Sequence, residues 1–375
     1  MKVPSTSRGV RAADSDRQRF RVLHVILVAG ETNSQYNQHC LPMKDIQDIS
    51  ICTYFEPRLT PPPEIALLAG DDTIRGFFRA LDRALRAEDY HAIHAHAPQT
   101  ATLVTLAVMG LPRRWQLRRR LVYTVRDSYH DYKPRNKLLM LPALAFWPRV
   151  VFCGQAAYES YPAWWRRLVG RRARVVQNAA DLERVERATA GVPRPENAAF
   201  RVLSIGRLEP VKDPMTVLTS FARVGDGARM AFIGAGSLAP ALADRVRAMG
   251  LEGCVELAGL IPRDEVFVRC AQADLFVSAS RGEGLPVAVI EAMAAGCPVV
   301  LSDIPPHREV ADGAEFVPFV APGDGAGFAR EVERFRTLPA AERAEIGAKC
   351  RELVHERFSL PRMHAAYGEI YAELG

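Results

Sequence analysis

Glu283 and Glu291 are carboxylates whose spacing suggests chemistry. They lie in the stretch R-G-E-G-L-P-V-A-V-I-E-A-M-A-A-G-C-P, residues 281–298. The pattern predicts a loop at Glu283 and a helix that carries Glu291 about two turns further on, roughly 10–12 Å away. The helix start between them suits a phosphate, so a ligand with hydroxyl groups on both sides of a diphosphate, such as a nucleotide sugar, fits the layout. Taken singly, both would be ordinary exposed glutamates.

Two cations, Arg207 and Lys212, follow an apolar run further upstream. Residues 200–205 read F-R-V-L-S-I and predict a buried strand, and G-R-L-E-P-V-K-D comes directly after it. Gly206 permits a turn at that point. Because an arginine bridges two phosphate oxygens and a lysine acts as a point charge, the pair suits a diphosphate. The alternative is a pair of solvent-facing charges in a turn.

The segments that must position these residues alternate between strands and helices. Residues 274–280 and 299–302 are apolar runs that predict parallel strands, and residues 285–295 predict a helix with Pro286 in its first turn. Strand–loop–helix–strand units of this kind build open α/β sheets, which bind ligands at the carboxyl ends of their strands. A chain of 375 residues is too long for one core and suits two such domains.

The first half of the chain also has polar side chains near the ends of its predicted strands. Apolar strands are expected at residues 21–29, 49–55, 90–96 and 121–126. We assign five residues that follow or end these strands to an acceptor substrate: Asn33, Tyr36, Asn37, His96 and Asp127. A polar surface loop is the alternative for the first three. His94 and His96 form a His-x-His pair without an apparent third ligand, so we expect no metal site.

The two motifs together resemble the donor site of a known enzyme family. E-G-L-P-x4-E-A-M-A-A-G-x-P-V-V and G-R-L-x-x-x-K-D are similar to signatures of retaining glycosyltransferases of family 4, which have the GT-B fold. The resemblance implies that Glu283 contacts the transferred sugar and Glu291 the ribose hydroxyls. It implies that Arg207 and Lys212 stabilise the departing nucleoside diphosphate. Further donor-binding residues follow from it: Gly206, Gly234, Leu260, Ile261, Gly284, Leu285 and Pro286.

Arg126 is the main departure from the family pattern. Many members have a histidine at this position, and that histidine contacts the donor sugar. An arginine keeps a hydrogen-bond donor but does not act as an acid or base near neutral pH. We place Arg126 in the catalytic set with Glu283, Arg207 and Lys212, where it would bind an anionic sugar or acceptor group or weaken catalysis.

The resemblance implies two Rossmann-like, doubly wound α/β domains that face a cleft, with a C-terminal helix crossing back to the first domain. We expect a disordered lead-in at residues 1–20 and a linker at 181–199. The acceptor-binding domain would comprise residues 21–180 plus 358–375, and the donor-binding domain residues 200–357.

Charge is divided unevenly along the chain. The formal charge is +12 for residues 1–180 and −6 for the remainder. Arginine-rich segments beside Trp115 and Trp164 suit an anionic membrane surface, or else are solvated helix faces, and we expect no nucleic acid partner. Seven scattered cysteines and no apolar leader predict a cytoplasmic protein. The basic first half would place it peripherally at the inner face of the membrane.

These features predict a retaining hexosyltransferase that moves a hexosyl unit from a UDP- or GDP-sugar to a hydroxyl group of a lipid-linked or cell-envelope glycan precursor. No cofactor is expected, because the nucleotide sugar is a co-substrate and the cations balance the leaving charge. One alternative is a nucleotide-sugar-binding partner of another transferase. A glycoside hydrolase is the other, and it needs Glu283 and Glu291 roughly 5–9.5 Å apart.

Overall fold

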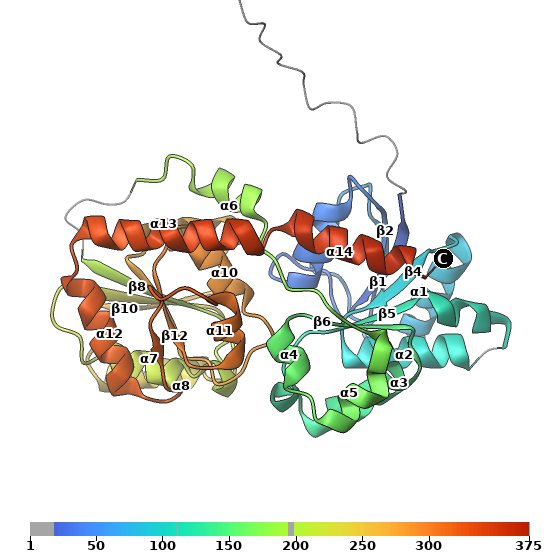
Figure 1. The fold of residues 1–375 in the computed structure, drawn as a ribbon, viewed down its shortest axis with the longest axis horizontal. Helices are drawn as coiled ribbons and strands as arrows, with labels where there is room; N and C mark the ends of the chain where they lie inside the picture. Colours follow the sequence, from blue (N-terminus) through green and yellow to red (C-terminus); the bar gives the residue numbers. More distant parts are fainter. Residues whose placement is uncertain (1–18, 111, 194–198, 375) are drawn as a thin grey trace, which may run out of the picture.

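A computed structural model describes residues 19–110, 112–193 and 199–374 of the chain. Nearly all of the predicted disordered lead-in, residues 1–20, lies outside the described residues. Within the described ranges, no helix is both long and apolar enough to cross a bilayer. Figure 1 shows two α/β lobes side by side, with the end of the chain lying across both.

The first lobe is built on a seven-stranded parallel sheet in the order β3-β2-β1-β4-β5-β6-β7. Its strands are β1 (Arg21–Ile26), β2 (Asp48–Thr53), β3 (Ala66–Leu68), β4 (Ala92–Ala95), β5 (Leu121–Val125), β6 (Arg149–Phe152) and β7 (Ala173–Val175). After β1 the chain builds outward on one side, and from β4 onward it builds on the other. The boundary between β1 and β4 is therefore the switch point at which such sheets bind ligands.

Helices cover both faces of this sheet because its strands are apolar on both sides. One face packs on α1 (Ile74–Ala87), α2 (Pro98–Met109), α3 (Pro134–Phe146) and α5 (Ala163–Val169). The other face packs on α14 (Leu360–Ala372) and on two short helical segments, η1 (Tyr36–Cys40) and η2 (Leu41–Met43). The polar sequence after the first strand predicts a loop, and the structure instead has these two helical segments there.

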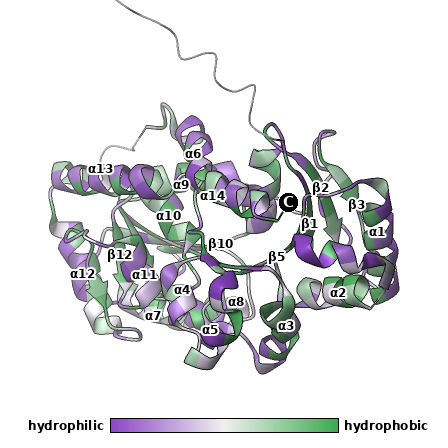
Figure 2. Ribbon diagram, turned by 45° about the vertical axis from the view of Figure 1, so that its right-hand side comes forward, coloured by the Kyte–Doolittle hydropathy of each residue, from purple (hydrophilic) through white to green (hydrophobic). Residues whose placement is uncertain are grey.

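The second lobe holds a six-stranded parallel sheet in the order β10-β9-β8-β11-β12-β13. Its strands are β8 (Phe200–Ile205), β9 (Ala228–Ile233), β10 (Val255–Gly259), β11 (Leu275–Ser278), β12 (Val299–Ser302) and β13 (Phe319–Val320). One face packs on α7 (Pro214–Phe221), α8 (Ala239–Ala248) and α12 (Gly325–Thr337), and the other on α9 (Arg263–Gln272), α10 (Val287–Ala294) and α13 (Ala340–Arg357). In Figure 2 the strands are mostly hydrophobic and the outer helix faces hydrophilic, as expected for a sheet that helices cover on both faces.

The chain crosses between the lobes twice. The predicted linker region contains α6 (Leu182–Thr189), which packs against α9 of the second lobe. At the other crossing, α13 lies along the second lobe and α14 returns to the first, where Tyr367 and Tyr371 are buried (Figure 1). The predicted return of the terminal helix and the two Rossmann-like parallel sheets are confirmed.

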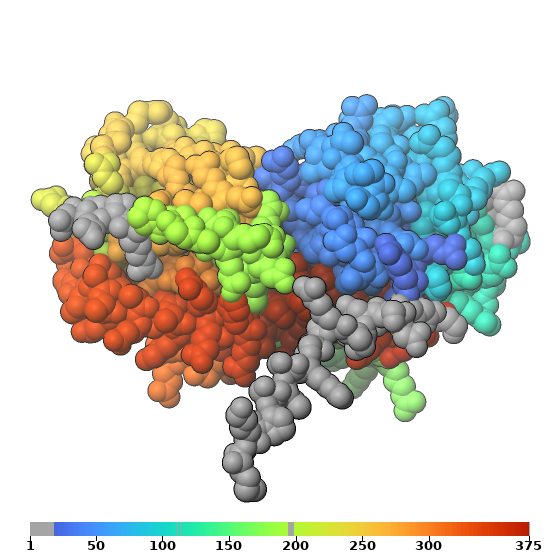
Figure 3. Space-filling view, turned by 90° about the horizontal axis from the view of Figure 1, so that it is seen from above, coloured from blue at the N-terminus to red at the C-terminus, as the bar shows by residue number. Residues whose placement is uncertain are grey.

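Direct hydrogen bonds join the lobes where they meet. Ser128 Oγ donates to the carbonyl of Glu283 at 2.5 Å, and Asn178 Nδ2 donates to the carbonyl of Leu285 at 3.0 Å. Glu309, in α11 (Pro305–Val310), accepts bonds from the backbone N–H groups that begin α4 (Gln155–Glu159). Figure 3 shows a notch between the two lobes on one side of the molecule.

Candidate active site

Glu283 and Lys212 form an ion pair at the carboxyl ends of β8 and β11. Oε2 of Glu283 pairs with Nζ of Lys212, and Oε1 accepts a hydrogen bond from Ser280 Oγ at 2.8 Å. Burial opposes the charge of this carboxyl, which is 9% exposed, but Lys212, His307 and the hydrogen bond from Ser280 together outweigh burial, so the pKa of Glu283 lies below its ordinary value. The carboxylate is therefore ionised and held in place before any ligand binds.

Arg207 extends from the end of β8 and is exposed. Its charge and that of Lys212 act on two half-buried carboxyls of the first lobe, Asp127 and Asp131. Burial raises the pKa of both carboxyls, and that of Asp131 reaches about 6. Two cations of one lobe thus face two carboxyls of the other across the cleft, so an incoming diphosphate would compete with those carboxyls for the cations.

Glycines let the backbone pass closely at this site. A Cβ at Gly234 would overlap the carbonyl of Gly206, so the ends of β8 and β9 meet without side chains. A Cβ at Gly284 would overlap the carbonyl of Arg126, and one at Gly282 would overlap the carboxyl of Asp131. The donor loop therefore lies directly against the first lobe.

Glu291 lies in α10 and is buried. It forms an ion pair with Arg263, the first residue of α9. Burial raises the pKa of Glu291, and Arg263 offsets part of that rise. Sequence reasoning missed Arg263, which stands in the segment G-L-I-P-R-D. A ribose would therefore meet a carboxylate that a guanidinium already orients.

The other predicted donor residues fall at the same edge of the second sheet. Leu260 follows β10 and is 62% exposed, whereas Ile261 packs against the core. The buried Leu285 presents its carbonyl to the first lobe. Pro286 is the N-cap residue, so α10 begins at Val287, two residues later than expected.

A cavity of about 260 Å3 lies at the switch point between β1 and β4 of the first sheet. Its lining residues follow β1, β2 and β4 in the chain: Leu27, Val28, Asn33, Gln35, Phe55, Arg58, His96 and Ala97. Two of the predicted acceptor residues, Asn33 and His96, line it. Sequence reasoning missed Phe55 and Arg58, because they come from the end of a different strand.

The remaining acceptor candidates lie elsewhere. Tyr36 is buried in the core beneath the first sheet. The side chain of Asn37 is also buried, and it donates to the backbone carbonyls of Glu31 and Asn33. Asp127 faces the cations of the donor side. The structure thus divides the five residues among the cavity, the core and the cleft.

Arg126 points into the first lobe. Its guanidinium donates to His39 Nε2 at 3.1 Å, to Gln38 Oε1 at 3.0 Å and to Ser34 Oγ at 3.3 Å. All three partners belong to the helical segment after β1. The side chain of Arg126 therefore fixes that segment, and only its backbone carbonyl touches the donor loop at Gly284.

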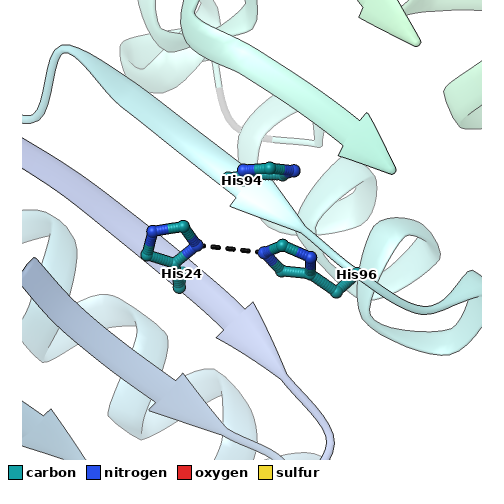
Figure 4. Close-up of side chains that lie close together, drawn as sticks. All are labelled: His24, His94 and His96. Carbon is teal, nitrogen blue, oxygen red and sulfur yellow. Dashed lines mark hydrogen bonds between the residues drawn. The ribbon is translucent and has the colours of Figure 1, made fainter. Parts of the chain in front are cut away.

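Three histidines lie close together in the first sheet (Figure 4). His24 is on β1, His94 is on β4 and His96 directly follows β4, and each has a ring nitrogen within 4.8 Å of one on the others. A third imidazole therefore exists beside the His-x-His pair, 70 residues away in sequence. His24 Nδ1 and His96 Nε2 are 3.0 Å apart, while both nitrogens of His94 are taken by Tyr371 Oη and Thr124 Oγ1. His94 is satisfied without a metal, so the geometry favours a hydrogen-bonded core, and the absence of a metal site stays a prediction.

Two family models match successive parts of the chain. The model described as Glycosyltransferase Family 4 matches residues 43–184, and the model described as Glycosyl transferases group 1 matches residues 199–337. The chain belongs to glycosyltransferase family 4. The family predicted from the Glu283 and Arg207 motifs is therefore confirmed.

Individual curated proteins match over shorter stretches. The amylovoran biosynthesis glycosyltransferase AmsK of Erwinia amylovora is 36% identical over 114 residues, 28% of each chain. The GDP-mannose:cellobiosyl-diphosphopolyprenol alpha-mannosyltransferase of Xanthomonas campestris is 31% identical over 144 residues, 37% of each chain. The matched stretches span less than half the length of these curated relatives.

A solved structure shows the same architecture over nearly the whole chain. Anabaena Alr3699/HepE in complex with UDP-glucose superposes with a TM-score of 0.74 and covers 94% of this chain and 100% of that chain. The two sequences are 17% identical, so the similarity establishes the shared GT-B fold.

Proposed function

We propose that the protein is a retaining hexosyltransferase that moves a hexosyl unit from a UDP- or GDP-sugar to a hydroxyl group. The observation that carries this proposal is the buried Glu283–Lys212 pair with Arg207 beside it, at the carboxyl edge of the second sheet. A diphosphate placed there meets two cations, and a sugar placed beside it meets an ionised carboxylate.

Each of these residues has a distinct role in the proposed reaction. The diphosphate draws Lys212 away from Glu283, and the freed carboxylate accepts hydrogen bonds from the sugar hydroxyls. The transition state has oxocarbenium character and a departing phosphate, whose negative charge Arg207 and Lys212 balance. The departing phosphate accepts the proton of the acceptor hydroxyl, so the step needs no side chain as a general base.

We assign the acceptor to the first lobe. The cavity at the β1–β4 switch point holds Asn33 and His96, and its place at the strand ends is where open α/β sheets bind ligands. One relative is named for a diphosphopolyprenol acceptor and another for the biosynthesis of amylovoran. These names support a lipid-linked or cell-envelope glycan precursor as the acceptor class.

A membrane-bound acceptor requires that the protein approach the bilayer, and one helical face of the first lobe suits this. Residues 98–175 contain 15 Lys and Arg against 3 Asp and Glu. Six large apolar side chains are exposed on α2, α3, α5 and η3 (Pro112–Arg120): Leu106, Trp115, Leu138, Phe146, Trp164 and Leu168. Figures 1 and 2 show α2, α3 and α5 side by side beneath the first sheet. Cations interleaved with exposed tryptophans suit an anionic lipid surface, so we place the protein at the cytoplasmic face of the membrane.

Calorimetric titration with UDP, GDP and ADP tests the donor site. We expect one nucleotide to bind, and Arg207→Ala and Glu291→Ala to weaken its binding at least tenfold through the phosphate and the ribose respectively. Arg223→Ala, an exposed arginine just after α7, is the matched control and should bind like the wild type. Failure of the wild type to bind any of the three nucleotides would overturn the proposal.

A second candidate function is a nucleotide-sugar-binding partner of another transferase. The observation that favours it is the inward orientation of Arg126, which leaves the family's histidine position without a side chain at the donor loop. Donor hydrolysis and transfer to a panel of acceptors, measured with the wild type and with Arg126→His, separate the two functions. Turnover by the wild type supports the transferase, whereas turnover gained only by the variant supports the binding protein.

A further inference from the structure

The cavity at the β1–β4 switch point contains a cation without a partner. Arg58 lines it, is exposed, and forms no side-chain hydrogen bond or ion pair with any described residue. Gln35, in the segment after β1, also lines the cavity and forms no side-chain hydrogen bond with any described residue. Two side chains with several unused N–H donors therefore indicate a ligand that accepts hydrogen bonds.

A buried donor or acceptor in the cavity wall supports the same conclusion. His96 is 2% exposed, and its Nδ1 has no partner within the described part of the chain. A buried polar atom left unpaired costs about 1–3 kcal/mol, and such atoms are rare in native structures. Because His96 lines the cavity, a ligand bound there could form the hydrogen bond that Nδ1 of His96 lacks.

The rest of the lining suits a saccharide. Phe55 presents an exposed ring, and Leu27 and Val28 add apolar lining. Binding sites combine apolar and aromatic walls with a few placed polar groups in this way. The volume of about 260 Å3 is below the roughly 300–1,000 Å3 of pockets for drug-sized ligands, so the cavity fits one sugar residue with its substituent.

The cavity is linked to the donor loop by a short series of contacts. The ring centroids of His96 and His39 are 4.7 Å apart, His39 Nε2 accepts from Arg126, and the carbonyl of Arg126 touches Gly284. A ligand in the cavity thus lies three contacts from the loop that carries Glu283.

We propose that this cavity binds a phosphate-bearing sugar of the acceptor, with Arg58 pairing with the phosphate and Phe55 packing on the sugar ring. The inference rests on the proposed function, because it names the chemical class of the acceptor. A guanidinium matches the two-oxygen geometry of phosphate, whereas a neutral glycan would leave Arg58 unpaired. The phosphate comes either from a lipid-linked diphosphate or from a free sugar phosphate.

Ligand binding measured with UDP at saturation separates this cavity from the donor site. The probes are glucose 1-phosphate and methyl glucoside, titrated by protein NMR. We expect the phosphate to bind at least tenfold more tightly than the neutral glycoside, and Arg58→Gln to remove that preference. Arg75→Gln, at an exposed arginine of α1 with no ion pair to a described residue, is the matched control and should retain it.

The outcomes are distinct. Equal affinity of Arg58→Gln and Arg75→Gln for glucose 1-phosphate, or no binding by the UDP-saturated wild type, overturns the inference while the donor site stands. Failure of UDP and GDP to bind overturns the proposed function instead. Arg58-dependent binding of glucuronate without binding of the phosphate overturns the phosphate assignment. A short-chain prenyl diphosphate sugar is compared with glucose 1-phosphate to distinguish the two phosphate sources. Tighter binding of the prenyl compound identifies the lipid-linked form, and tighter binding of glucose 1-phosphate identifies the free sugar phosphate.

Discussion

Arg126 donates a hydrogen bond from Nη1 to Nε2 of His39 at 3.1 Å. Because an arginine has no acceptor, Nε2 of His39 must carry a lone pair, so His39 is neutral in this arrangement. Burial and the charge of Arg126 both lower the pKa of His39, which agrees with that assignment. One residue thereby connects two regions, since its side chain anchors the helical segment after β1 and its carbonyl touches the donor loop.

Replacing Lys212 by alanine should remove a cation from the departing diphosphate and leave Glu283 without its partner. We expect kcat to fall roughly 100- to 1,000-fold, as for loss of one oxyanion-stabilising group. The pKa of Glu283 should rise, because the lysine that opposes the effect of burial is gone. Steady-state kinetics on Lys212→Ala check this, with Lys349→Ala on the exposed surface of α13 as the control.

Gly284→Ala should disturb the contact between the lobes. The added methyl group would overlap the carbonyl of Arg126 and the thiol of Cys153, so the donor loop must shift away from the first lobe. We expect a loss of about 1–3 kcal/mol in the free energy of unfolding and a larger proportional loss of activity. Gly253→Ala is the control, since its methyl group would meet nothing within 4 Å. Unchanged activity in Gly284→Ala would contradict the assigned position of the loop.

The Arg263–Glu291 pair should behave as a buried ion pair. Arg263→Ala leaves a buried carboxylate without its cation and should lower the free energy of unfolding by about 3 kcal/mol. The double variant Arg263→Ala/Glu291→Ala should recover part of that loss, because no charge is then left unpaired. Urea denaturation of the single and double variants measures the coupling, and strictly additive losses would argue against the pair.

The buried imidazoles should make stability depend on pH. The pKa of His24 is lowered by burial to about 3, from 6.5, and burial also lowers the pKa of His39, His94 and His96. The unfolded chain therefore binds protons at these sites below about pH 6.5 while the folded protein does not, so stability falls as pH falls. His24 alone accounts for about 2 kcal/mol between pH 7 and pH 5. Denaturant titrations at both values test this, and a His24→Leu variant should show a smaller slope.

Membrane association should depend on the exposed tryptophans of the first lobe. Sedimentation with phosphatidylglycerol vesicles should pull down the wild type but not Trp115→Ala/Trp164→Ala, and neutral vesicles should bind neither. Salt should weaken the association, because each exposed cation near the surface contributes about 1 kcal/mol. Ile74→Ala, which removes an exposed apolar residue of α1, is the matched control. Equal binding of all variants would refute the assigned face.

The donor side could be predicted from the sequence because the residues of each motif are close together in the chain. Glu283 and Glu291 stand on one loop and helix, and Arg207 and Lys212 on one turn, so spacing and family pattern sufficed. The sequence did not predict Arg263, because it lies on a different helix from its partner Glu291. The roles of the donor residues stay predictions, while their common location at one sheet edge is a feature of the structure.

The acceptor side depends on contacts between distant segments, which no local pattern reveals. His24 joins His94 and His96 only when β1 pairs with β4, and Arg58 reaches the cavity from beyond β2. The helical turns at η1 and η2 bury Tyr36 and Asn37, which looked like loop residues in the sequence. Tertiary packing thus decided which polar side chains face a ligand.

The return of α14 to the first lobe has a consequence for synthesis on the ribosome. Tyr371 Oη bonds His94, and Tyr367 Oη bonds Thr124, so the last helix completes the core of the first sheet. During translation the strands of that sheet emerge first, whereas α14 emerges only after the whole second lobe. The apolar surface that α14 covers on the first lobe therefore lacks that helix while the second lobe is being made.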